Sequence, residues 1–124
     1  MAEPTYKNSV FINKDGYVEI ALIGDQSEET FKRSYYEVLP LIEKLKGAKK
    51  PMYGLMDMSQ ETGYSLASDK AALEILESLD YDKLAMCNVP HRHVAQGIIQ
   101  AIGRDHNTKI FGNRTDALAW LHAD

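Results

Sequence analysis

The chain of 124 residues has one cysteine and no long apolar run, and each absence excludes a class of protein. A lone cysteine, Cys87, cannot form an internal disulfide, which excludes a disulfide-stapled secreted scaffold. No apolar stretch approaches the roughly 20 residues that a membrane helix needs. The N-terminus has no basic region followed by an apolar run, so it is not a secretory signal. We therefore expect a cytoplasmic protein that does not insert into a membrane.

Positive charge is scarce as well. The chain has 14 Lys and Arg against 18 Asp and Glu, which gives a formal net charge of −4. Nucleic-acid-binding proteins usually carry a basic face, so we expect no nucleic-acid partner. The composition, 44% hydrophobic and 26% charged, is typical of a globular protein. The length predicts one domain, residues 1–124.

Apolar periodicity predicts strands that alternate with helices. The expected strands cover residues 10–12, 17–23, 52–58, 83–89 and 108–111, and the expected helices cover about 25–47, 65–79, 91–105 and 113–121. Asp15-Gly16 between the first two strands is a hairpin signal. The order β-β-α-β-α-β-α-β-α predicts an α/β fold with four helices. Its five-stranded sheet is mostly parallel, with an antiparallel N-terminal hairpin at the edge.

Three finer features are also expected. Pro40 inside the first helix should cause a kink or a local break, because proline removes a backbone hydrogen bond. Residues 60–66 are polar and contain Gly63, which indicates a loop. The buried stripe of the third helix is expected at Val94, Ala95, Ile98, Ala101 and Ile102.

Polar residues follow the predicted parallel strands. In open α/β sheets, ligands bind beyond the carboxyl ends of the strands. The candidate rim for a ligand or a partner consists of Asp57, Ser59, Asn88, His91 and Asn113. Helix caps and polar loops explain each of these residues equally well, and we favour that explanation for each one alone.

Catalytic and metal-binding patterns are weak. His91 and His93 are two residues apart, so they do not share a helix face, and no Cys or Glu completes a metal set. We expect no metal and no other cofactor. Cys87 lies in a predicted buried strand, where a cysteine usually serves as a small apolar residue. A third hypothesis is a small enzyme that uses Asp57, Ser59 and His91. It ranks below the others because no catalytic motif accompanies these residues.

Two groups of apolar side chains suggest binding. Four methionines lie on the two central strands, namely Met52, Met56, Met58 and Met86. Their flexible side chains can line an adaptable apolar pocket, although ordinary core packing also explains them. On the first helix, Tyr36 should project to the side beside Leu39, as a partner or dimer surface would require.

The chain resembles the SpoIIAA-like branch of the STAS superfamily, which includes SEC14-like domains. Four segments carry the resemblance: Ile20-Ala21-Leu22-Ile23-Gly24, Leu55-Met56-Asp57-Met58-Ser59, Tyr81-Asp82-Lys83-Leu84-Ala85-Met86, and Ile110-Phe111 with Ala117-Leu118-Ala119-Trp120-Leu121. The resemblance implies a non-enzymatic domain of five strands and four helices. In anti-sigma-factor antagonists, a serine at the start of the second helix is phosphorylated within an Asp-Ser-Ser-Gly-like motif. Ser65 and Ser68 lie at that place here without the motif.

The leading hypothesis is therefore a non-enzymatic STAS-like module that acts through protein–protein contacts or self-association, with phosphorylation of Ser65 or Ser68 as a possible control. The alternative is a carrier or sensor of a small apolar or lipid-like ligand. A pocket bordered by Met56 and Met58 would favour this alternative.

Overall fold

The computed structural model describes residues 8–25, 28–63, 74, 77–89 and 92–123. Its elements are β1 (Ser9–Ile12), β2 (Val18–Asp25), α1 (Glu28–Gly47), β3 (Tyr53–Gly63), β4 (Lys83–Cys87), α3 (Arg92–Ala101), β5 (Thr108–Phe111) and α4 (Arg114–His122). The predicted alternation of strands and helices is confirmed in this part of the chain. Three helices are described. Most of the predicted second helix, with Ser65 and Ser68, lies outside the described residues.

The five strands form one mixed sheet in the order β1-β2-β3-β4-β5. β1 pairs with β2 antiparallel, and each later pair is parallel, as predicted. The hairpin turn follows from two local features. Gly16 has a φ of 84°, which favours glycine. The Asn13 side chain accepts hydrogen bonds from the backbone N–H groups of Asp15 and Tyr17.

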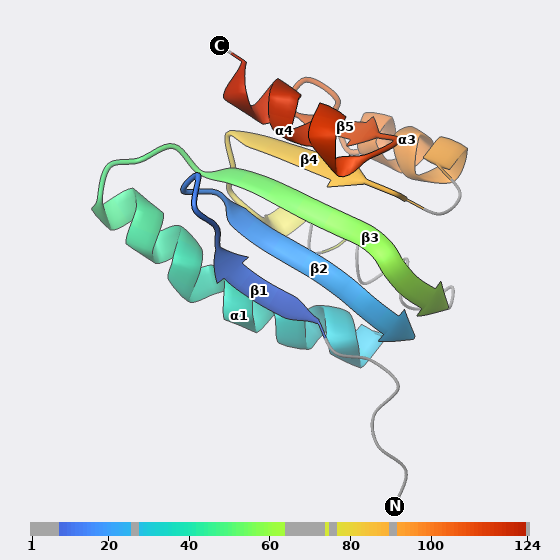
Figure 1. Cartoon of the computed structure of the whole chain (residues 1–124), viewed down its shortest axis with the longest axis horizontal. Helices are drawn as coiled ribbons and strands as arrows, with labels where there is room; N and C mark the ends of the chain where they lie inside the picture. The colour runs from blue at the N-terminus through green and yellow to red at the C-terminus, as the bar shows by residue number, and fades with distance from the viewer. Residues whose placement is uncertain (1–7, 26–27, 64–73, 75–76, 90–91, 124) are drawn as a thin grey trace, which may run out of the picture.

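Helices lie on both faces of the sheet (Figure 1). α1 and α3 pack on one face of the sheet. There, the apolar side chains of the two helices and of alternate strand positions form the larger core cluster. Its buried members are Val18, Ile20, Leu22, Phe31, Val38, Ile42, Leu45, Met52, Met56, Leu79, Tyr81, Leu84, Met86, Ile99 and Ile110. α4 packs on the opposite face over β3, β4 and β5. The smaller cluster there contains Leu55, Ala85, Cys87, Ala117 and Leu121.

The third strand is longer than predicted. β3 continues to Gly63, so the expectation of a loop over residues 60–66 is wrong for residues 60–63. β2 explains the difference, because it runs to Asp25 and pairs with β3 as far as Gly63. This pairing uses backbone groups, so the polar sequence after Met58 does not end the strand. Ser59 consequently lies within β3 rather than in a loop beyond it.

Two expectations about helices are also wrong in detail. α1 is continuous from Glu28 to Gly47 through Pro40, so the expected local break is wrong, and the alternative of a kink stays a prediction. Packing of its apolar face against the sheet offsets the missing backbone hydrogen bond. In α3 the buried residue is Ile99, whereas Val94 is 60% exposed and Ala101 is exposed. The helix is therefore rotated relative to the predicted stripe, with Ala95 and Ile102 packed at the core boundary.

Candidate functional site

Three of the five predicted rim residues meet where β4 ends beside the middle of β3. One carboxylate oxygen of Asp57 accepts hydrogen bonds from the backbone N–H of Ser59 at 2.9 Å and from the Asn88 side chain at 3.3 Å. Asn88 directly follows β4 with a φ of 59°, a left-handed conformation that asparagine tolerates better than most residues. Burial favours the neutral acid, but hydrogen bonds from Ser59, Asn88 and Cys87 outweigh it and lower the pKa of Asp57.

Cys87 is fully buried beside this carboxylate, as predicted for a core cysteine. Burial is the main cause that raises the pKa of its thiol to about 11, and the charge of Asp57 adds to it. A nucleophilic cysteine must be a thiolate near neutral pH. Cys87 therefore remains a protonated thiol.

Glu19 and Arg114 form a second polar pair on the same face of the sheet. Arg114, the first residue of α4, donates two hydrogen bonds of 2.8 Å to the two carboxylate oxygens of Glu19 on β2. Asn13 donates a third at 3.1 Å. Burial raises the pKa of Glu19, yet these hydrogen bonds and the charge of Arg114 leave it below its usual value. The sequence interpretation missed this pair, because 95 residues separate its partners.

The remaining predicted rim residues do not join this group. Asn113 caps α4, because its side chain accepts a hydrogen bond of 2.8 Å from the backbone N–H of Asp116. His91 lies outside the described residues. Hydrogen bonds to Asp57 therefore connect β3 with the residue that follows β4, and hydrogen bonds to Glu19 separately connect β2 with α4. Neither carboxyl group is protonated near neutral pH, so neither can act there as a general acid.

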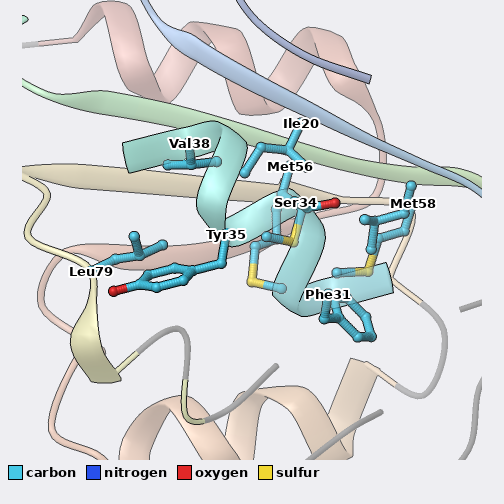
Figure 2. A pocket seen from close by; sticks show the side chains of 10 residues that line it. Ile20, Phe31, Ser34, Tyr35, Val38, Met56, Met58 and Leu79 are labelled. Carbon is cyan, nitrogen blue, oxygen red and sulfur yellow. The ribbon is translucent and has the colours of Figure 1, made fainter. Parts of the chain in front are cut away.

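A cavity lies on the other face of the sheet, between α1 and the central strands (Figure 2). Its volume is about 50 Å³. The lining residues come from β2, α1, β3 and β4 together with Leu79, and they are Ile20, Leu22, Phe31, Ser34, Tyr35, Val38, Met56, Met58, Leu79 and Met86. Figure 2 shows Tyr35 and Val38 extending from α1 and Met56 lying below the helix on the sheet side.

The described residues that line this cavity are almost wholly apolar, and none of them carries a charged side chain. Ser34 is buried, and its hydroxyl accepts a hydrogen bond of 2.9 Å from Asn8. Tyr35 and Met58 are only half-buried, so solvent reaches the wall at these two places. The sequence indicated Met56, Met58 and Met86 as possible pocket residues. The contribution of α1 was missed, because its apolar stripe is typical of any helix that packs on a sheet.

The outer surface of α1 carries the predicted exposed aromatic residue. Tyr36 is 69% exposed, and Leu39 beside it is half-buried. The Tyr36 ring contacts that of Tyr35, with 5.8 Å between the ring centroids. One side of this aromatic pair therefore lies at the cavity and the other lies in solvent.

Residues 8–25, 28–63, 74, 77–89 and 92–123 contain no cluster of three or more His, Cys, Asp or Glu side chains that could hold a metal ion. Within the same ranges, no helix has both the length and the apolar character needed to cross a bilayer.

Comparison with known proteins supports the fold. No protein-family model and no curated protein matches the chain. Among solved structures, the chain is similar to an uncharacterized protein of the DUF3478 family with a SpoIIAA-like fold, from Shewanella loihica PV-4. The TM-score is 0.61 at 20% sequence identity, and the match covers 98% of each chain. This chain therefore has the SpoIIAA-like fold that the sequence resemblance implied.

Proposed function

We propose that this protein is a non-enzymatic binding module that holds a small, uncharged, apolar molecule between α1 and the sheet. The observation that carries the proposal is the apolar cavity bordered by Met56, Met58 and Met86. Methionine side chains are unbranched and flexible, so the cavity can adapt its shape to an occupant. Binding of a small apolar or lipid-like ligand, which was the alternative hypothesis from the sequence, thus becomes the first candidate function.

The energetic cost of an empty cavity supports this proposal. Protein interiors are packed about as densely as organic crystals. At about 24 cal/mol per Å³, a cavity of this size lowers stability by about 1 kcal/mol. An apolar occupant removes this cost and gains contacts with the lining. Water gains little there, because it needs polar partners that the lining scarcely provides.

The state of the rim favours binding over catalysis. Asp57 and Glu19 are ionised and hydrogen-bonded to neighbouring side chains, and Cys87 is a buried thiol. A general acid at Asp57 or Glu19 would need a protonated carboxyl group, and a nucleophile at Cys87 would need a thiolate. We therefore propose no reaction at the rim.

The proposal predicts that toluene binds in the cavity. Labelled methionine methyl groups provide the measurement, because NMR resolves each of them during a titration. The signals of Met56, Met58 and Met86 should shift with saturation. Met52 is as buried as Met86 but is not among the residues that line the cavity, so its signal should stay in place.

Two variants of α1 provide the control. Val38→Phe should fill the cavity and abolish the shifts. Leu45→Phe introduces the same ring at a buried α1 position outside the cavity and should preserve them. If the three cavity signals stay unchanged up to the solubility limit of toluene, the proposal is wrong. If the signals do shift, native mass spectrometry of protein from its own cells would identify the natural occupant.

We keep protein contact, the leading sequence hypothesis, as the second candidate. It rests on the 69% exposed Tyr36 on the outer side of α1, and we assign this surface to a second copy of the chain. Aromatic side chains are enriched in interfaces between proteins. Phosphorylation at Ser65 or Ser68 would be a separate control of such contacts and stays a prediction.

Analytical ultracentrifugation tests the second candidate. The wild-type protein should sediment as a dimer at micromolar concentration, and Tyr36→Ser should weaken the dimer at least tenfold. Glu43→Ser, at an exposed position of the same helix, should have no effect. A wild-type protein that is monomeric at 100 times that concentration would contradict self-association through this surface.

A further inference from the structure

We infer that the cavity selects molecules with an aromatic ring over saturated molecules of similar size. This inference rests on the proposed binding function and specifies the chemical class of the ligand. It depends on which atoms line the cavity rather than on its apolar character alone.

Three thioether side chains gather on one wall of the cavity. Met56 on β3 and Met86 on β4 are direct partners in the parallel pairing of these strands, so their side chains lie side by side on the same face. Met58 follows on that face of β3 and also lines the cavity. Three of the five methionines of the chain therefore border one small space. Figure 2 shows Met56 and Met58 on the strand side of the cavity.

Sulfur favours an aromatic occupant. A methionine sulfur makes a favourable contact with an aromatic ring at about 5 Å, often at the ring edge, and a saturated ring offers no such contact. Each contact is worth roughly twofold to tenfold in affinity. Two or three simultaneous contacts are therefore enough for clear discrimination between ligands of equal shape.

The α1 wall adds two aromatic side chains. Phe31 and Tyr35 line the cavity from the helix side. Aromatic rings prefer offset or edge-to-face contacts, with ring centroids about 4.5–7 Å apart. A ring bound between Met86 and Tyr35 would thus meet sulfur on one side and an aromatic neighbour on the other. A saturated ring would gain only ordinary dispersion contacts from both walls.

Size limits the ligand to about one ring. The volume of about 50 Å³ is smaller than the engineered cavity of about 150 Å³ known to accept benzene. Side chains must therefore move when a ring enters, and three flexible methionines permit this. The half-buried Met58 and Tyr35 lie where the wall meets solvent. Because none of the described lining residues is charged, the bound ring should itself be uncharged.

The experiment compares toluene with methylcyclohexane, its saturated counterpart. Both are titrated into the protein and followed by the methionine methyl signals. Toluene should bind at least tenfold more tightly, although methylcyclohexane is the more hydrophobic of the two. The protein is then prepared with norleucine in place of methionine, which replaces each sulfur with a methylene group and keeps the side-chain length. Binding is followed there by the ligand's own NMR signals, and the preference for toluene should fall to threefold or less.

Site-directed variants identify the sulfur atoms involved. Met86→Leu should reduce the preference for toluene severalfold, whereas Met52→Leu, at a buried position outside the cavity, should leave it unchanged. Equal affinities for the two molecules in the methionine protein would overturn the inference and leave the proposed binding function intact. A preference that survives norleucine would overturn the role of sulfur. If neither molecule binds, both the inference and the proposed function are wrong.

Discussion

Leu121→Ala should lower the free energy of unfolding by about 3 kcal/mol, the typical cost of truncating a buried leucine. Leu121 is 1% exposed and packs with Leu55, Ala85 and Cys87 under α4. All three partners belong to the hydrogen-bonded central strands β3 and β4, which cannot move inward to fill the space. The truncation should therefore leave most of the cavity that it creates. Urea unfolding followed by circular dichroism measures the change.

Leu118→Ala is the matched control on the same helix. Leu118 is half-buried at the edge of the small cluster, so its truncation should cost about 1 kcal/mol. The toluene affinity read from the methyl signals of Met56, Met58 and Met86 should stay within twofold of wild type in folded Leu121→Ala protein, because the proposed site lies on the other face of the sheet. A loss of less than 1 kcal/mol in Leu121→Ala would show that α4 adds little to the stability of the fold.

Arg114→Met should lower the free energy of unfolding at pH 7 by about 1 to 2 kcal/mol. The substitution leaves the Glu19 carboxylate, which is 8% exposed, with Asn13 as its hydrogen-bond donor. Removing one partner of a fully buried ion pair costs about 3–5 kcal/mol. The Arg114 side chain is 43% exposed, so solvent screening reduces this figure. The substitution also removes a positive charge from the start of α4, where the helix dipole disfavours it, and this reduces the expected loss by a few tenths of a kcal/mol.

The effect of Arg114→Met should depend on pH. In the wild-type protein the pKa of Glu19 is lowered, so its contribution to stability is present above the usual glutamate pKa of about 4.3 and is lost as the pH falls. In the variant, burial dominates and raises this pKa, so acid stabilises the folded variant relative to its unfolded state. The difference between the two proteins should therefore narrow from pH 7 to pH 3.

A double-mutant cycle with Glu19→Gln separates this pair from other effects of acid. The Glu19→Gln protein should lose most of its sensitivity to Arg114→Met at every pH. If the difference between wild type and Arg114→Met is constant from pH 7 to pH 3, Glu19 is not the group responsible.

Much of the fold was predictable because its signals are local. Alternation placed Val18, Ile20 and Leu22 on one face of a strand, and all three are buried in the larger cluster. Asn113 was identifiable as a helix cap from its position before an apolar pattern. The extension of β3 to Gly63 was not predictable in this way, because it depends on backbone pairing with β2.

The site residues also differ in whether a local sequence pattern could predict them. Asp57 and Asn88 were predictable as neighbours, because both were expected near the carboxyl ends of parallel strands, although β3 itself continues to Gly63. The pairing of Glu19 with Arg114 depends on how α4 packs across the sheet, and no local pattern contains that information. Likewise, the sequence located the methionines on the strands but did not indicate that Phe31 and Tyr35 would complete a cavity with them.

The unequal lengths of β3 and β4 have a consequence for the dynamics of this region. β3 pairs with β4 only as far as Asp57, and beyond that point it pairs with β2 alone. In Figure 1 these two strands extend past the end of β4 as a two-stranded ribbon. Each strand of such a ribbon is paired on one side only, so the free energy of local opening is lower there than at the centre of a sheet. Met58 lies in this segment, so a molecule bound as proposed would exchange through local opening of this ribbon while the other strands stay paired.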